Sequence, residues 1–484
     1  MENYIEFSSP EKQGLKSENI KKYISSLTEK GVCLHSLLIF RNGKLVAEGY
    51  EKHFDKDFKH RMYSVSKTFV SAAIGCLIGE GKLSLDDEVY KFFPDKCPEN
   101  LHEYVRQATV RDLLTMSTPF DNTTYEPTDK DWVYTFFNTE PSHRPGRVFN
   151  YDTSATLVLD AIVERITGLD FTVYLYEKVL KYIGFDCAPE CVRETGGVQW
   201  GGSGVLCTSR NLGAFAMLFM NGGKSSDGKQ LIPAEYVKEA TAMQICNAQS
   251  NEGAVFRAQG YGYQIWMTEF GFAFLGMGNQ LAICVPEKNI LAVTTADDQG
   301  NSSARDYIFD LLKKYVIDEC YADDESAGNE PVCLDEFFKI PVLEGTKEKT
   351  VQDEISGKAF EICENKNGFE KISFVFSGDE GKMLYRRAGE DKALYFGVNR
   401  YVDGVFPEKY SGMTVGIPAG EGYKCTTAAF WTEKDKLVLR CYCIDRYFGN
   451  FTANISFKGG TLDINFKKTA EWFLNEYTGY LSSK

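Results

Sequence analysis

The sequence predicts an α+β protein in which an antiparallel sheet flanked by helices is followed by a C-terminal all-β domain. Apolar runs typical of strands lie near both ends of the first 320 residues, with a long helix-rich stretch between them. Strands from the two ends would pair into one sheet with helices packed on it. After about residue 350, short alternating runs separated by turn residues are typical of a barrel or a sandwich. We expect a first domain at 1–320, a linker at 321–350 and a β domain at 351–484.

The start of the first domain predicts one helix and one hairpin. Apolar residues recur at helical spacing over residues 17–30, with Ser17 as a candidate cap. Two apolar runs at 35–40 and 45–50 are joined by Arg41–Asn42–Gly43. Because Asn-Gly between such runs favours a two-residue turn, we expect an antiparallel hairpin here.

The rest of the first domain predicts helices first and strands afterwards. The run at 65–78 is apolar at helical spacing and ends at Gly79 and Gly81. Further helices are expected at 110–116, 155–167 and 211–221, strands at 261–267, 272–275, 281–285 and 290–295, and a closing helix at 304–316.

The linker and the β domain are predicted from composition and alternation. Residues 321–350 are rich in acidic and small residues and contain two prolines, which is typical of a linker. Alternating runs lie at 369–376, 392–399, 424–431, 436–443, 451–457 and 461–466. The last apolar stretch, at 470–481, is expected to form a short helix.

Composition excludes several classes of function. A net charge of −14 gives no general attraction for nucleic acid or an anionic membrane. The polar opening does not resemble a secretory signal, and no apolar run reaches the roughly 18–20 residues of a membrane span. The fourteen cysteines are scattered without the paired spacing of a metal site, which favours free thiols. We therefore expect a cytoplasmic protein without metal, nucleic-acid or membrane partners; its oligomeric state is not predicted.

A possible catalytic pair lies at the entrance to the apolar run at 65–78. Ser64 precedes Lys67 by three residues, so on a helix both side chains would share one face. A serine hydroxyl needs a base to become a nucleophile, and a lysine with a lowered pKa is one such base. The alternative interpretation makes Ser64 a helix cap and Lys67 a solvated side chain. Two other S-x-x-K matches, Ser9 to Lys12 and Ser226 to Lys229, precede no long apolar run.

Two further stretches bear on this choice. Tyr151 stands just before the apolar run at 155–167, where it could be a second proton-transfer group or merely a packed ring. Residues 276–279, Gly-Met-Gly-Asn, lie between two predicted strands. Glycine lets the backbone approach a ligand closely, although a plain hairpin turn would also contain it.

Together these motifs resemble the serine β-lactamase and penicillin-binding-protein superfamily, over roughly residues 10–318. "YSVSKTF" matches its first motif, "FNYDT" its Tyr-x-Asn motif, and "GMGNQ" its Lys-Thr-Gly or His-x-Gly motif on a strand edge. The class C-like branch, with its esterases, D-amino-acid peptidases and 6-aminohexanoate-dimer hydrolases, is the most similar. The resemblance implies a β-lactamase/transpeptidase-like fold and no cofactor. It also implies Ser64 as nucleophile, and Lys67 and Tyr151 as proton-transfer groups.

The resemblance also implies a substrate site with two departures from the family pattern. Thr153 replaces the usual Asn, and Met277 stands where the family has a cation or a histidine. Met carries no charge to hold a substrate carboxylate, which argues against β-lactams. The oxyanion would lie between the N–H groups of Ser64 and Gln280, or Asn279. The candidate substrate-binding residues are Thr153, Trp266, Met277, Gly278, Asn279 and Gln280.

We therefore expect a serine hydrolase that acts through an acyl-enzyme on a small-molecule ester or amide. Two alternatives stay open: a catalytically silent binding or sensor protein on this fold, and a D-amino-acid peptidase or β-lactamase. The altered second and third motifs favour the silent alternative. A Ser-His-Asp triad is disfavoured because none of the five histidines lies in a triad context.

Overall fold

The computed structural model divides the chain into two compact units, Met1–Lys339 and Ile340–Lys484. The residues that it describes are 4–248, 259–322, 324, 326–340, 342, 345–346, 348–408, 422–446, 449–470 and 474–484. The boundary falls inside the segment expected as a linker. Strand β11 (Val332–Cys333) lies in that segment but pairs in parallel with strand β3 (Lys44–Tyr50), so it belongs to the first unit.

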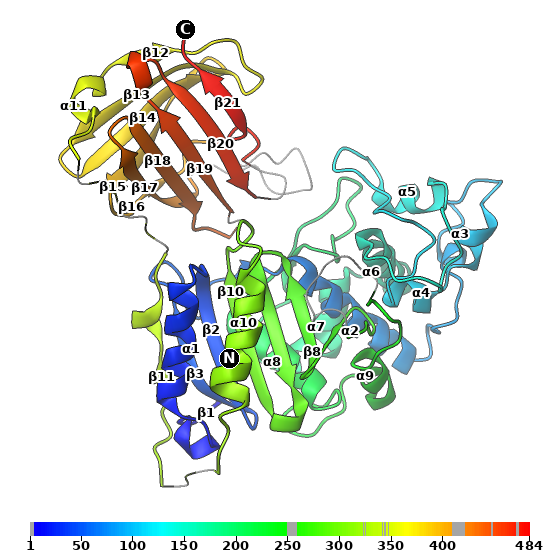
Figure 1. Cartoon of the computed structure of the whole chain (residues 1–484). Helices are drawn as coiled ribbons and strands as arrows, with labels where there is room; N and C mark the ends of the chain where they lie inside the picture. The colour runs from blue at the N-terminus through cyan, green and yellow to red at the C-terminus, as the bar shows by residue number, and fades with distance from the viewer. Residues whose placement is uncertain are drawn as a thin grey trace. The chain divides into compact units, whose positions relative to one another are not determined.

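The first unit contains an eight-stranded sheet to which both ends of the predicted domain contribute (Figure 1). Its strands, in spatial order, are β1 (Glu6–Phe7), β3, β2 (Leu34–Arg41), β10 (Ile290–Ala296), β9 (Gln280–Val285), β8 (Gly271–Gly276) and β7 (Trp266–Thr268), with β11 beside β3. Strand β2 pairs antiparallel with β10, and Leu38 lies opposite Val293. The predicted pairing of early and late strands is thus confirmed.

Helices cover the sheet and form a second layer beside it. Helices α1 (Ser17–Glu29) and α10 (Ala304–Leu312) pack against each other in front of the sheet in Figure 1. Helix α8 (Ser209–Met220) packs against β2, β9 and β10. Helix α2 (Ser66–Gly79) contacts α6 (Thr153–Thr167) and α7 (Phe171–Lys178), and it is buried from Ser66 to Leu77. An apolar surface on every side is what a helix buried all round requires.

Shorter elements complete the first unit. They are α3 (Glu103–Gln107), α4 (Val110–Leu114), α5 (Trp132–Asn138), α9 (Ala234–Ala240) and a small sheet of β4 (His60–Arg61), β6 (Val205–Cys207) and β5 (Glu190–Cys191). The predicted hairpin is present, with Asn42 at φ 51° and Gly43 at φ 79°. Positive φ at both central residues is the type I′ geometry that Asn-Gly favours.

The second unit is a closed β barrel. Of the two predicted forms, a barrel and a sandwich, the structure thus has the barrel. Its strands, in order, are β12 (Ala359–Glu361), β13 (Phe369–Ser377), β14 (Glu380–Arg387), β15 (Glu390–Val398), β17 (Lys424–Glu433), β18 (Lys436–Cys443), β19 (Gly449–Ser456), β20 (Asp463–Thr469) and β21 (Gly479–Ser482), with β16 (Val402–Val405) beside β17 and a short helix α11 (Gln352–Ile355). Cys363 N–H donates to Ser482 O at 2.9 Å, and Lys484 N–H donates to Glu361 O at 2.8 Å. These two bonds join the first strand to the last.

Three local expectations were wrong. The described part of the predicted C-terminal helix at 470–481 contains β21 instead, and residues 471–473 lie outside the described residues. The predicted strand at 261–267 begins only at Trp266. Strand β14 was not predicted, because few of its side chains are apolar and only Met383 and Tyr385 are buried. None of the described helices is long and apolar enough to cross a membrane.

Candidate active site

Ser64 lies in a tight turn between strand β4 and helix α2. Met62 N–H donates to Val205 O at 2.8 Å, which fixes the chain to β6 just before the serine. Tyr63 then adopts φ 48°, in the left-handed region that non-glycine residues rarely occupy. A strained residue of this kind is held in place by its surroundings and is common at functional sites. It turns the chain so that Ser64 is half-buried, while its neighbours Tyr63 and Val65 are buried.

The amine of Lys67 contacts the hydroxyl of Ser64. Lys67 Nζ lies 3.1 Å from Ser64 Oγ and donates to Gly202 O at 2.6 Å. The lysine is 1% exposed, so it is not a solvated side chain. Ser64 is not a cap either, because the residue before α2 is Val65 and no side chain caps that helix. The geometry therefore excludes the alternative of a plain helix start.

The two other S-x-x-K matches are arranged differently. Lys12 Nζ donates to Asn329 Oδ1 at 2.7 Å, and Lys229 Nζ lies 3.5 Å from the centre of the Tyr182 ring. In each case the amine is occupied away from its serine. The contact at Ser64 is thus not a general result of the spacing.

Arg61 and the loop at 202–203 are parts of the site that sequence reasoning missed. Arg61 Nε donates to Ser203 O at 3.0 Å, and one terminal nitrogen donates to Ser203 Oγ, also at 3.0 Å. Its guanidinium carbon lies 4.4 Å from the centre of the Tyr63 ring. The only signals in the sequence were an arginine three residues before Ser64 and the glycine-rich stretch Gly-Gly-Ser-Gly at 201–204.

Tyr151 belongs to an aromatic wall beside the lysine. Lys67 Nζ lies 5.0 Å from the centre of the Tyr151 ring. The rings of Tyr151 and Trp266 are 5.3 Å apart, and Tyr261 meets Trp266 edge-on at 5.0 Å. Phe149 completes the group at 5.9 Å from Trp266. Two of the predicted residues, Tyr151 and Trp266, are therefore brought together near the Ser64–Lys67 pair.

Thr153 and the unpredicted Asp152 lie at the start of α6. A Cβ on Gly202 would be 2.4 Å from Thr153 Cγ2, so Thr153 packs on the loop whose carbonyl holds Lys67. Asp152 is fully buried and caps the helix by accepting from Ser154 N–H at 2.8 Å. Burial raises the pKa of the Asp152 carboxyl, although its hydrogen bonds and the charge of Lys67 oppose this shift.

The end of β8 approaches the segment before Ser64 at Gly276, whereas Gly278 in the following turn does not come as close. A Cβ on Gly276 would lie 2.4 Å from Met62 O, whereas the nearest atom to a Cβ on Gly278 is 3.2 Å away. The backbone of β8 therefore touches the segment that precedes Ser64. Met277 follows in the turn and is 42% exposed. The close approach to the serine segment is therefore made by Gly276, one residue before the first of the expected substrate-binding residues Met277–Gln280.

The side chains of Asn279 and Gln280 are used inside the protein. Asn279 Oδ1 accepts from Arg305 Nε at 3.0 Å, and its Nδ2 donates to Asp298 Oδ2 at 3.2 Å. Gln280 Nε2 donates to Ala296 O at 2.7 Å. Both side chains are buried, so a substrate could contact only the backbone of these two residues.

One titratable group beneath this turn is strongly perturbed. Burial raises the pKa of the Asp298 carboxyl to about 7, against opposing hydrogen bonds from Cys33 N–H and Asn279. Asp298 Oδ1 accepts from Cys33 N–H at 2.8 Å. The carboxyl therefore ties the turn to the start of the sheet and titrates near neutrality.

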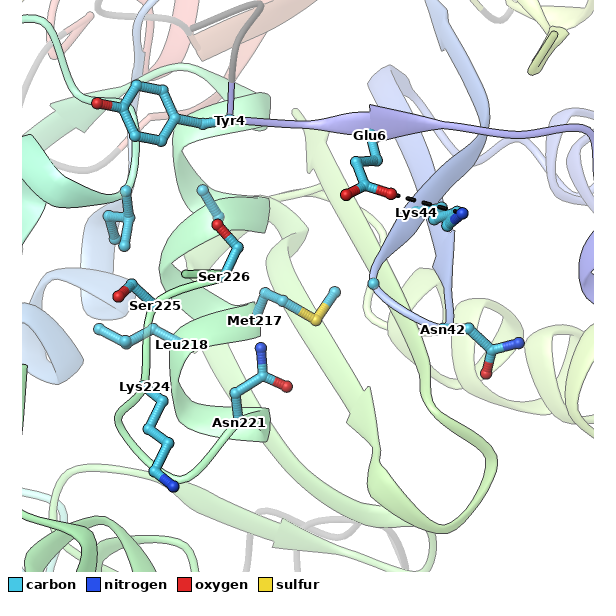
Figure 2. A pocket seen from close by; sticks show the side chains of 13 residues that line it. Tyr4, Glu6, Asn42, Lys44, Met217, Leu218, Asn221, Lys224, Ser225 and Ser226 are labelled. Carbon is cyan, nitrogen blue, oxygen red and sulfur yellow. Dashed lines mark ion pairs between the residues drawn. The ribbon is translucent and has the colours of Figure 1, made fainter. Parts of the chain in front are cut away.

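A separate pocket of about 270 Å³ lies between the β2–β3 hairpin and the end of α8 (Figure 2). Its lining includes the ion pair of Glu6 and Lys44, whose charged atoms are 3.4 Å apart, and the side chain of Met217. None of Ser64, Lys67 and Tyr151 lines this pocket. It is thus distinct from the site at Ser64.

Comparison with known proteins identifies the family. A family model described as β-lactamase matches residues 23–315, which is more than half of the chain. The chain belongs to the β-lactamase family. Membership in this family confirms the resemblance that the motifs indicated, and the matched residues include every strand of the large sheet except β1 and β11.

Individual relatives of this β-lactamase-family chain are distant. The 6-aminohexanoate-dimer hydrolase of Paenarthrobacter ureafaciens is 24% identical over 254 residues, which are 49% of this chain and 64% of that protein. Protein flp of Staphylococcus aureus (strain N315) is 30% identical over 181 residues, 34% of this chain and 36% of that protein. The chain spans less than two thirds of either relative.

Two solved structures have a similar fold. A Bacillus anthracis protein assigned as a 6-aminohexanoate-dimer hydrolase gives a TM-score of 0.51 at 21% identity, covering 65% of this chain and 87% of that one. EstCE1, described as a hydrolase with promiscuous acyltransferase activity, gives 0.50 at 14% identity, covering 61% and 98%. At such identities the likeness concerns the fold alone.

Proposed function

We propose that the first unit is a serine hydrolase that forms an acyl-enzyme on Ser64 with a neutral small-molecule ester or amide. The observation that carries the proposal is the buried amine of Lys67, 3.1 Å from Ser64 Oγ and held by Gly202 O at 2.6 Å. This is the distance over which a general base removes a hydroxyl proton. The name of one sequence relative, 6-aminohexanoate-dimer hydrolase, supports the same class of reaction.

The reaction would proceed in two stages, acylation of Ser64 and hydrolysis of the acyl-enzyme. Ser64 Oγ attacks the substrate carbonyl carbon while its proton passes to the neutral amine of Lys67. The tetrahedral intermediate collapses when the leaving group departs with a proton from Lys67 or Tyr151, leaving an ester on Ser64. A water molecule then attacks this ester and its proton passes to the same bases, which return a proton to Ser64 Oγ as the Oγ–acyl bond breaks and the acid is released.

Two backbone N–H groups would stabilise the developing oxyanion. Ser64 N–H is one, because it lies at the entrance to α2. Met277 N–H is the second, because it follows Gly276, whose backbone touches Met62. This assignment replaces Gln280 and Asn279, which the sequence favoured, and rests on where the strand meets the serine segment.

The preference for neutral substrates is inferred from the side chains around Ser64. The wall of Phe149, Tyr151, Tyr261 and Trp266 is largely apolar, and Met277 carries no charge. Arg305 lies near the turn, and it donates to Asn279 Oδ1 and, at 3.1 Å, to Gly276 O. Two of its nitrogens are therefore hydrogen-bonded to the end of β8 and the turn that follows. A carboxylate placed against the aromatic wall would lose water without a compensating partner.

Covalent labelling tests the nucleophile. Wild type should react with a fluorophosphonate probe, and Ser64→Ala should abolish labelling. Ser226→Ala is the matched control, because Ser226 is exposed and has a lysine at the same spacing, yet should label like wild type. Labelling that persists in Ser64→Ala would refute the assignment. A wild-type protein that neither labels nor turns over any ester or amide would favour the silent binding protein.

A substrate panel tests the preference. It contains p-nitrophenyl esters with and without a carboxylate near the scissile bond, short amides, D-amino-acid peptides and a chromogenic cephalosporin. We expect neutral esters or amides to give the highest kcat/KM. If carboxylate-bearing substrates are preferred, and Arg305→Met removes that preference, the D-amino-acid peptidase or β-lactamase alternative replaces this one.

A further inference from the structure

Arg61 connects the two halves of the candidate site. It lies on β4, opposite Leu206 of β6, and is 1% exposed. On one side its guanidinium donates twice to Ser203, through Nε to the carbonyl and through a terminal nitrogen to the hydroxyl, each at 3.0 Å. On the other side it lies over the ring of Tyr63, 4.4 Å from its centre. Ser203 follows the residue that binds Lys67, and Tyr63 precedes Ser64.

We propose that Arg61 is a positioning residue that holds Ser64 and Lys67 in the geometry needed for proton transfer. The inference rests on the proposed function of the Ser64–Lys67 pair and adds to it the group that fixes their mutual placement. The contacts described for Arg61 are with Ser203 and Tyr63, so it would act through Tyr63 and through the loop at 202–203.

The contact with Ser203 fixes the acceptor of Lys67. Gly202 O accepts from Lys67 Nζ at 2.6 Å, and its peptide is bonded directly to Ser203. A guanidinium holds two oxygens with a rigid, planar pair of N–H donors, whereas the three donors of an ammonium rotate freely and impose no such geometry. Thr153 closes the other side of Gly202, leaving no room for a Cβ. The carbonyl is therefore held from both sides, and with it the amine of Lys67.

The contact with Tyr63 fixes the nucleophile. Tyr63 has φ 48°, a conformation that persists only where the surroundings enforce it. A guanidinium over an aromatic ring is an attractive contact, and Trp200 lies on the same cation at 4.9 Å. Anchoring the Tyr63 ring in this way supports the strained turn that presents Ser64.

The test measures how fast folded protein is labelled by the fluorophosphonate probe. Arg61→Met should lower the first-order rate constant at saturating probe roughly 10- to 100-fold, because a misplacement of about 1 Å costs about 100-fold. The probe concentration at half-saturation and the fraction finally labelled should stay at the wild-type values. A purely structural role would lower the final fraction and leave the rate constant unchanged.

Control variants distinguish the effect of the paired guanidinium hydrogen bonds from the effect of the positive charge and from general destabilisation. Arg61→Lys keeps the positive charge but loses the planar pair of donors, so its labelling rate constant should be at least about tenfold below that of wild type. Arg210→Met removes another largely buried arginine with a pair of donors on one partner, Glu48, and should label at the wild-type rate. If Arg61→Met does not fold, Ser203→Ala, which removes one of the two bonds, should still slow labelling several-fold.

The outcomes distinguish this inference from the proposed function. If wild type is not labelled, the proposed function fails. If wild type is labelled, and Arg61→Met or Arg61→Lys reacts at the wild-type rate, the positioning role is refuted while the nucleophile stands. An unchanged rate in Ser203→Ala would likewise overturn the role of the 202–203 loop.

Discussion

Gly276→Ala should disable the site by pushing the end of β8 away from the serine segment. The added Cβ would lie 2.4 Å from Met62 O. In real structures a Cβ atom essentially never lies closer than 3.0 Å to a non-bonded heavy atom. The backbone on one side must therefore move by at least 0.6 Å, and by 1.0 Å to reach an ordinary contact of 3.4 Å. The obstacle is a backbone carbonyl, so no flexible side chain can give way.

The expected loss of activity follows from that displacement. Met62 lies two residues before Ser64, and Met277 follows Gly276, so the movement separates the two proposed oxyanion donors. A misplacement of about 1 Å costs about 100-fold, and loss of one oxyanion donor costs about 100- to 1,000-fold. We expect kcat/KM to fall roughly 100-fold. Overpacking should lower the free energy of unfolding by about 1–3 kcal/mol.

The assay compares three glycine variants by esterase kinetics and urea unfolding. Gly278→Ala should lose some stability, because Gly278 has φ 70°, but less than about tenfold in kcat/KM. Gly404→Ala, in the barrel and with nothing within 4 Å, should leave activity unchanged. If Gly278→Ala is inactive and Gly276→Ala is active, the oxyanion donor returns to Gln280 or Asn279.

Three further expectations concern single side chains. Lys67→Met should slow labelling by at least about 100-fold with the fold intact by circular dichroism; a smaller effect would leave Lys67 without a role as base. Met277→Lys should raise the preference for carboxylate-bearing esters less than about tenfold, because a side chain 42% exposed keeps its charge hydrated; a larger change in kcat/KM would show a desolvated site. Asp298 has a pKa raised from 3.8 to about 7, so the folded state binds more protons between those values. Its contribution to stability is therefore present at low pH and is lost as pH rises through 7. The unfolding free energy of wild type relative to Asp298→Asn should fall between about pH 4 and 7, and a difference independent of pH would contradict the shift.

The parts of the structure that were predictable depend on neighbouring residues. The Asn42–Gly43 turn and the contact between Ser64 and Lys67 each arise within four residues, where spacing and propensity decide the geometry. The barrel strands with strict alternation, such as β18, were also predictable, because every second side chain is buried.

The parts that were not predictable depend on distant pairing. The bond from Arg61 to Ser203 joins residues 142 positions apart, through the pairing of β4 with β6. The close approach of Gly276 to Met62 O was not predictable either, because the two residues are more than 200 positions apart and meet only where the end of β8 packs on the serine segment. The sequence predicts a helix where strand β21 forms, because the pairing of β21 with β20 and its closing bonds to the first strand are not visible in the local pattern.

The order of strands in the sheet has a consequence for how the chain is made. Strand β2 ends at Arg41, but its neighbour β10 begins only at Ile290, about 250 residues later. At roughly 5–20 residues per second, the ribosome needs about 12–50 s to supply that neighbour. During this interval the apolar hairpin of β2 and β3 lacks its partner strand, so its apolar surface and unpaired edge can aggregate or be bound by chaperones. The serine and the turn that would stabilise its oxyanion come together only late in synthesis, so this chain cannot acquire the proposed activity while the first unit is still incomplete.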